Sequence, residues 1–165
     1  MKIVSISAVV LLSAGFVLAQ SHLAPTSDMT LAATAGGPAP STAIPPSPSE
    51  QQAVQQNVKD IHFDFDRAEL RPEDQITLQS DAQWLKANPN TLVTIEGDAD
   101  DRGDIVYNVA LSEKRAAVTK DALVSMGVPA DQIVYATGWG KLYPICSEAD
   151  ESCWSQNRRA HFSAW

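Results

Sequence analysis

Residues 91–127 read TLVTIEGDADDRGDIVYNVALSEKRAAVTKDALVSMG and have the clearest pattern of secondary structure in the chain. The first part of this stretch, Thr91 to Glu96, alternates polar and apolar residues, which predicts a β-strand. An acidic loop from Gly97 to Asp104 follows. Apolar residues then recur at helical spacing, which predicts a long helix from about Ile105 to Met126. Gly127 is the usual residue to end such a helix.

The same reading extends to both sides of this stretch. Asp60 to Asp66 alternates as a strand does, with Ile61, Phe63 and Phe65 on one face. Pro72 opens a second helix, with acids in its first turn, and residues 88–90 (NPN) end it. Two more strands are predicted at Gln132 to Thr137 and at Arg159 to Ala164. This order, βαβαββ, predicts an α/β sandwich: a mixed sheet of about four strands, covered by two main helices.

The chain is predicted to have three parts. Residues 1–19 are interpreted as a signal peptide, since Lys2 precedes an apolar stretch that ends in small residues before the cleavage position at Ala19. That stretch is shorter than the roughly 20 apolar residues that span a bilayer, so a retained anchor is the less favoured alternative. Residues 20–57 are rich in Pro, Ala and Ser, which predicts a disordered linker. Residues 58–165 form the folded domain.

The only two cysteines are Cys146 and Cys153. Because the chain is predicted to leave the cytoplasm, a local disulfide is favoured over two free thiols. A zinc site is less favoured, since only His161 lies nearby and zinc takes four ligands. No cysteine stands directly after the predicted signal peptide, so a lipid-modified N-terminus is not expected.

The balance of charge argues against nucleic acid as a partner. The chain has 12 Lys and Arg against 20 Asp and Glu, and a formal net charge of -8. A polyanion requires a broad basic surface, which this composition does not provide. Any anionic ligand must therefore be met by a few placed cations.

Arg115 is the most informative cation. On a helical projection it lies in the middle of the apolar arc of the long helix, where an unpaired charge is costly. The sequence therefore predicts an anionic partner for it. The candidates are the acids of the preceding loop: Asp98, Asp100, Asp101 and Asp104. A structural ion pair is one reading. The other is a site for a zwitterion, with an Asp for the ammonium and Arg115 for the carboxylate.

The acidic loop also resembles two other kinds of site in part. Asp98, Asp100 and Gly103 match the start of a calcium-binding EF-hand loop, but Arg102 and Val109 stand where oxygen ligands are required, so no metal or cofactor is predicted. Hydrolysis by paired carboxylates lacks a feature that would raise one pKa into the range of an acid catalyst. The histidines His62 and His161 are interpreted as sheet residues rather than catalysts.

Six segments, in this order, carry a resemblance to a known family: residues 63–66 (FDFD), 95–103 (IEGDADDRG), 107–116 (YNVALSEKRA), 127–128 (GV), 138–144 (GWGKLYP) and 157–159 (NRR). They resemble the OmpA-like peptidoglycan-binding domain, over about residues 60–165. The resemblance implies that Asp100 and Arg115 hold the diaminopimelate end of a peptidoglycan stem peptide. It also implies that the pocket is lined by Phe65, Asp66, Arg102, Asn108 and Leu111.

Four of these five lining residues also have plain structural readings. Phe65 and Leu111 suit a hydrophobic core, and Asp66 and Asn108 suit caps or turns. The sequence departs from the family pattern at Asp98, where histidine is frequent, and in the cysteine-bearing segment near residues 146–153. The lipid-acceptor cysteine of the family's lipoproteins is also missing, so the sequence leaves the mode of membrane attachment open.

The resemblance implies a non-enzymatic protein of the periplasm or outer membrane that binds peptidoglycan. It also implies a possible second partner, the β-propeller protein of the Tol system. Two alternatives from other classes are a wall-lytic enzyme and a calcium-dependent adhesion module.

Overall fold

The computed structural model describes residues 45–165. The predicted signal peptide and most of the predicted linker lie outside this range. The elements, in chain order, are α1 (Pro48–Asn57), β1 (Ile61–His62), α2 (Pro72–Ala87), β2 (Val93–Asp98), α3 (Ile105–Ser125), a 3-10 turn (Ala130–Gln132), β3 (Ile133–Gly140), α4 (Glu151–Asn157) and β4 (Arg159–Ala164).

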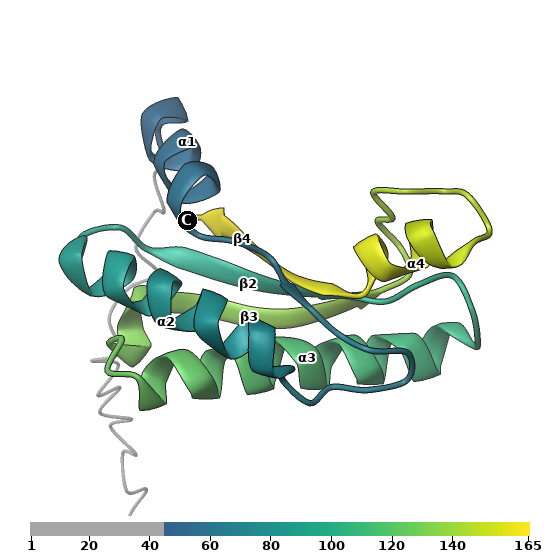
Figure 1. Ribbon diagram of the computed structural model, residues 1–165. Coiled ribbons are helices and arrows are strands. Elements are labelled where there is room, and N and C mark those ends of the chain that lie inside the picture. Colours follow the sequence, from purple (N-terminus) through teal and green to yellow (C-terminus); the bar gives the residue numbers. More distant parts are fainter. Residues whose placement is uncertain (1–44) are drawn as a thin grey trace, which may run out of the picture. The chain divides into compact units, whose positions relative to one another are not determined.

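The four strands form one mixed sheet in the order β1-β4-β2-β3. β2 and β3 are parallel, whereas β4 runs antiparallel to both β1 and β2. Helices α2 and α3 lie on one side of the sheet, and α1 and α4 rise on the other (Figure 1). The predicted fold class, a mixed four-stranded sheet with two main helices, is confirmed.

The hydrophobic core joins the sheet to α2 and α3. Its fully buried side chains include Phe63, Leu78, Leu85, Ile95 and Phe162. Each side chain of this size contributes roughly 1.5–3 kcal/mol to the free energy of unfolding when it is buried. This core fixes the position of α3 relative to the strands.

Two glycines let α3 approach the sheet unusually closely. A Cβ atom at Gly97 would lie 2.0 Å from the carbonyl oxygen of Ser112, and one at Gly138 would lie 2.2 Å from the backbone nitrogen of Glu113. The Oγ of Ser112 accepts a hydrogen bond from the Gly140 nitrogen at 2.8 Å. The first half of α3 is therefore held against the ends of β2 and β3.

The structure corrects the predicted linker, because part of it is helical. α1 begins with a capping box in which the Ser47 side chain accepts from the Glu50 nitrogen and the Glu50 carboxylate accepts from the Ser47 nitrogen. Val54 of this helix is fully buried in the core. Its sequence has a single apolar anchor and no helical stripe, so the periodicity of the sequence did not reveal it.

The first predicted strand is also corrected. Only Ile61 and His62 pair as β1; the chain then turns, with Asp66 at a φ of 58°. Phe65 consequently leaves the face that it was predicted to share with Ile61 and Phe63, and it is 57% exposed. In the sequence, the alternation of polar and apolar residues continues to Asp66, past the point where the backbone turns toward α2.

The other predicted elements can be compared with the structure one by one. α2 begins at Pro72 and β4 has the predicted bounds. β2 begins and ends later than the predicted range of residues 91–96, and β3 continues past the predicted end at residue 137. The predicted disulfide joins Cys146 and Cys153, with a Cα–Cα distance of 5.3 Å. α4 was not predicted. Within residues 45–165, the helices are all too short or too polar to cross a bilayer.

Replacing Gly97 by alanine should lower the free energy of unfolding by about 3 kcal/mol, because the added methyl group would collide with the α3 backbone. Gly127→Ala is the matched control. Its φ of 90° strains an alanine, but the nearest atoms belong to the flexible Lys86 side chain, so about 1 kcal/mol is expected. Urea denaturation measures both. Equal losses would contradict the close contact.

A second stability prediction concerns Asp81 of α2. The side chain is buried; Oδ1 accepts from the Lys59 nitrogen at 3.1 Å, and Oδ2 has no partner in the described part of the chain. Burial raises the pKa of Asp81 to about 7, against the opposing effect of the Lys59 hydrogen bond. The folded chain therefore binds this proton more tightly than the unfolded chain.

Between the unfolded pKa, about 4, and the folded pKa, about 7, this residue lowers stability as the pH rises, because the unfolded state ionises first. Asp81→Asn should thus gain stability relative to the unmodified protein across this window. Asp121→Asn makes the same chemical change at an exposed position of α3 and is the control. Thermal unfolding at several pH values measures both, and parallel curves for Asp81→Asn would refute the effect.

Candidate functional site

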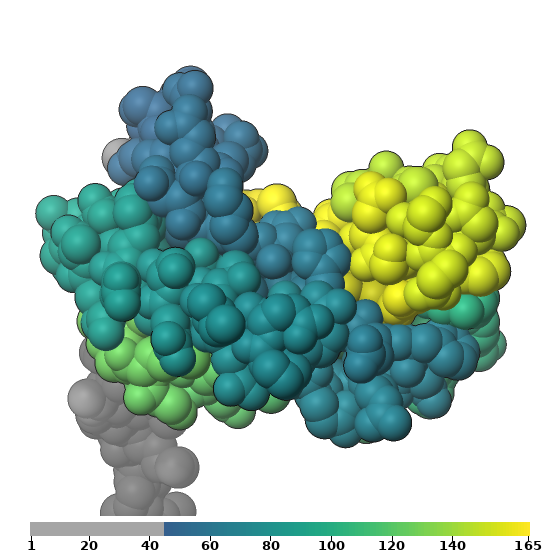
Figure 2. Space-filling model, viewed as in Figure 1, coloured from purple at the N-terminus to yellow at the C-terminus, as the bar shows by residue number. Residues whose placement is uncertain are grey.

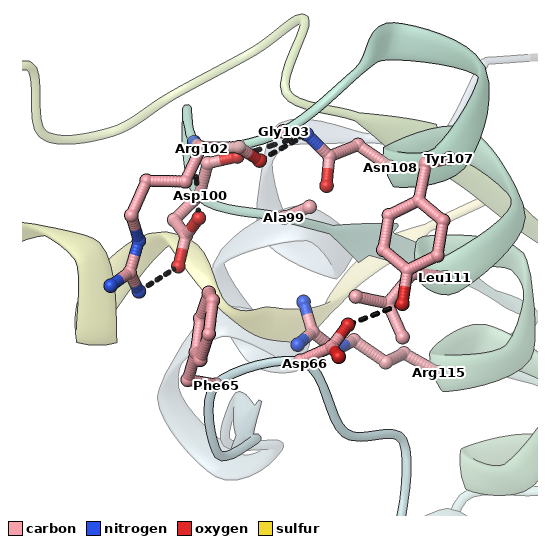
Figure 3. Close-up of a pocket in the computed structure, with 10 residues that line it drawn as sticks. All are labelled: Phe65, Asp66, Ala99, Asp100, Arg102, Gly103, Tyr107, Asn108, Leu111 and Arg115. Atoms are coloured by element: carbon pink, nitrogen blue, oxygen red, sulfur yellow. Dashed lines mark hydrogen bonds and ion pairs between the residues drawn. The ribbon is translucent and has the colours of Figure 1, made fainter.

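A pocket of about 250 Å³ opens where three segments meet: the β1–α2 connection, the loop after β2, and the first half of α3 (Figure 3). It is lined by Phe65, Asp66, Ala99, Asp100, Arg102, Gly103, Tyr107, Asn108, Leu111 and Arg115. All seven residues that the resemblance implied for the site are in this set.

Arg115 is fully buried, and backbone carbonyls hold it. Its Nε donates to Arg67 O at 2.9 Å, Nη1 to Asp98 O at 2.8 Å and Nη2 to Asp64 O at 3.2 Å. Of the two readings of Arg115, the structural ion pair is contradicted: among the described residues, no acid lies within ion-pair distance of it. Carbonyl dipoles satisfy the guanidinium instead, which leaves its charge without a counter-ion.

Burial lowers the pKa of Arg115 to about 10, although the nearby Asp100 acts in the opposite direction. The side chain therefore keeps its charge at neutral pH. The pocket thus contains a positive charge that neither solvent nor an ion pair neutralises.

Asp100 is almost fully buried and pairs with two other arginines. Its Oδ2 accepts from Arg102 at 2.5 Å and from Arg158 at 3.1 Å, and its Oδ1 accepts from the Arg102 nitrogen at 3.2 Å. Burial raises the pKa of Asp100, but the hydrogen bonds from Arg102 and Arg158 outweigh it and leave the pKa lowered. Asp100 is a fixed carboxylate at neutral pH.

Arg102 lies between two aromatic rings. Its guanidinium carbon is 4.0 Å from the centre of the Phe65 ring and 4.1 Å from that of Trp154. Such stacking adds attraction between the cation and the ring faces. The exposed ring of Phe65 therefore has a specific partner at the pocket rim, where Figure 3 shows it beside Arg102 and Asp100.

The other lining residues shape the loops. Asn108 is buried and donates to Arg102 O at 2.8 Å, which ties the acidic loop to α3. The Tyr107 hydroxyl donates to the carboxylate of Asp66, whose positive φ is uncommon for a residue other than glycine. Leu111 is half-buried. The contacts of Asp66 and Asn108 thus hold the loops that form the pocket walls. Such contacts also suit the structural roles, in caps or turns, that the sequence allowed for these two residues.

Sequence reasoning missed four residues of this site. Tyr107 lies four residues before Leu111 and eight before Arg115, so helical spacing could have placed it on the same face. Ala99 and Gly103 contribute mainly backbone. Arg158 supports Asp100 from 58 residues away in the sequence, and no local pattern signals that contact.

Asp98 lies outside the pocket. It pairs with Arg159 at 3.0 Å, and Arg159 also contacts Asp60 at 3.2 Å. Burial raises the pKa of Asp98 to about 6, while Arg159 acts against this shift. The two acids that matched a calcium loop, Asp98 and Asp100, are therefore both engaged by arginines.

The fold and the pocket define an α/β binding module with a buried cation and a buried carboxylate. Residues 62–158 match the family model described as the OmpA family. The chain belongs to the OmpA family.

Two curated relatives are peptidoglycan-associated lipoproteins. That of Agrobacterium fabrum is 49% identical over 115 residues, which cover 69% of this chain and 64% of that protein. That of Pseudomonas putida is 38% identical over 125 residues, which cover 76% and 74%. The chain thus spans slightly less than two thirds of the Agrobacterium protein. Both relatives are named for association with peptidoglycan.

Solved structures agree with this fold. The peptidoglycan-associated lipoprotein from Burkholderia pseudomallei has a TM-score of 0.62 at 38% identity, covering 65% of this chain and 90% of that one. The C-terminal domain of Helicobacter pylori MotB has a TM-score of 0.61 at 15% identity, covering 66% and 84%. The second likeness shows a shared fold alone.

Arg115→Lys should lower the free energy of unfolding by about 2–4 kcal/mol, because one ammonium cannot reach the three carbonyls that the guanidinium satisfies. Arg67→Lys makes the same chemical change at an exposed side chain and should cost less than about 0.5 kcal/mol. Urea denaturation compares them. An unchanged stability for Arg115→Lys would show that the carbonyl contacts contribute little.

Proposed function

We propose that this pocket binds the diaminopimelate end of a peptidoglycan stem peptide, and that the protein is a non-enzymatic component that anchors or organises the cell envelope. One observation carries the proposal: Arg115, a buried cation with no carboxylate partner among residues 45–165, shares a pocket with the fixed carboxylate of Asp100. A zwitterionic ligand would complement both.

The free hydrogen-bonding capacity of the two side chains supports this assignment. A guanidinium has five N–H donors, and Arg115 directs three of them at carbonyls, which leaves two for a ligand carboxylate. The Oδ1 of Asp100 accepts only a backbone N–H, so it retains capacity for a ligand ammonium. Diaminopimelate carries both groups on one carbon.

The likeness to peptidoglycan-associated lipoproteins supports the same ligand class. With the predicted signal peptide, it also supports a location in the periplasm or at the outer membrane. The β-propeller protein of the Tol system is proposed as a second partner on the same likeness. Pull-down with that purified protein tests this separate proposal.

Asp100→Asn should weaken binding of the domain to purified sacculi at least tenfold, or about 1.4 kcal/mol, because it removes the charge that meets the ligand ammonium. Asp101→Asn is the matched control: it is the next residue, its side chain is exposed, and it is absent from the pocket lining. Co-sedimentation with diaminopimelate-containing sacculi measures both, after melting curves confirm that each variant is folded.

Equal retention of the two variants would refute the site. Release of soluble muropeptides by the unmodified protein would favour the wall-lytic alternative. Loss of binding on addition of a calcium chelator would favour the adhesion alternative.

A further inference from the structure

No residue of helix α4 lines the pocket. Trp154 and Glu151 of this helix, however, contact the arginines that hold Asp100. The geometry assigns Trp154 as a positioning residue for the ligand site, and assigns the disulfide-closed segment from Cys146 to Asn157 as the brace that keeps Trp154 in place. The inference rests on the proposed function, since ligand affinity is its main measure.

Trp154 completes the support of Arg102. The guanidinium lies between the rings of Phe65 and Trp154, with nearly equal separations of 4.0 and 4.1 Å. Phe65 lies in the connection between β1 and α2 and is more than half exposed, whereas Trp154 is half-buried in a helix. Trp154 is therefore the more firmly held of the two rings that contact Arg102.

Arg102 in turn fixes the carboxylate that the proposed ligand needs. Its Nη2 donates to Asp100 Oδ2 at 2.5 Å and lies 3.7 Å from Glu151 of α4. Glu151 also accepts from Arg158, which reaches the same oxygen of Asp100 at 3.1 Å. Both cations that orient Asp100 are thus attached to α4, one by stacking and one by an ion pair.

α4 itself depends on the disulfide segment. A helix of seven residues is too short to be stable alone. Cys153, which is fully buried, joins it to Cys146, and Asn157 accepts from the nitrogens of Ile145 and Cys146 and donates to Cys146 O. Figure 2 shows this segment as a separate lobe (yellow) on the domain surface.

The lobe adds no ligand contact of its own; it determines how firmly the anionic side of the pocket is held. Reduction of the disulfide frees the start of α4, and Arg102 and Arg158 then lose the partners that aim them at Asp100. The affinity of the pocket is therefore predicted to depend on the oxidation state of a bond outside it.

The test measures calorimetric binding of the tripeptide L-Ala-γ-D-Glu-meso-diaminopimelate. Trp154→Ala should weaken binding about tenfold, and Trp154→Tyr, which keeps a ring at this position, should restore most of it. The Cys146→Ser, Cys153→Ser double variant should weaken binding in the same direction. Trp165→Ala, at the opposite end of β4, is the control and should bind as the unmodified protein does.

A positioning role requires coupling to Arg102. In an Arg102→Ala background, adding Trp154→Ala should change the affinity less than twofold, whereas general destabilisation would add its full effect. Unchanged binding by Trp154→Ala, or fully additive effects, would overturn the inference.

An NMR measurement separates this inference from the proposed function. The Arg102 Nε–H resonance, shifted by the flanking rings, should move in Trp154→Ala and in the cysteine variant without any ligand present. If the unmodified protein fails to bind the tripeptide, the proposed function fails. The positioning role is then tested by this resonance alone, and it fails if the resonance stays in place.

Discussion

The burial of the Arg115 charge is the constraint on which the rest of the site depends. Its guanidinium takes carbonyls from two positions of the β1–α2 connection and from the end of β2, so three segments must converge on one point of α3. An uncompensated guanidinium in the interior would cost several kcal/mol. The same arrangement creates the pocket, because the loops that supply the carbonyls to Arg115 also form the pocket walls.

The two charged groups of the pocket are stabilised in different ways. Arg115 is held by neutral dipoles and keeps an unbalanced charge, whereas Asp100 is surrounded by two arginines that exceed its own charge. The charges of the described site balance, because Arg102, Arg115 and Arg158 stand against Asp66, Asp100 and Glu151. Arg115 is the cation that a ligand carboxylate can meet, since its own contacts are neutral carbonyls.

Local patterns predicted the parts of the fold that local forces determine. Pro72 starts α2, Gly127 follows α3, and the polar–apolar alternation from Arg159 marks β4. The partners of Arg115 could not be read in this way, because a projection shows that a charge is buried but not whether carbonyls or carboxylates surround it. The Arg158 contact with Asp100 and the Trp154 stack on Arg102 bring together residues more than 50 positions apart, and only the folded chain establishes them.

The place of β4 in the sheet has a consequence for the order of assembly. The last strand lies between β1 and β2, so the first strand has no neighbour until the final residues of the chain arrive. A nascent chain that stops short of residue 158 can form α2, α3 and the β2–β3 pair, but β1 stays unpaired and Asp100 lacks Arg158. The pairing of β1 with β4 and the contact of Arg158 with Asp100 are thus formed together, late in folding. A chain threaded through a narrow channel would reach its binding-competent form only after its C-terminus has emerged.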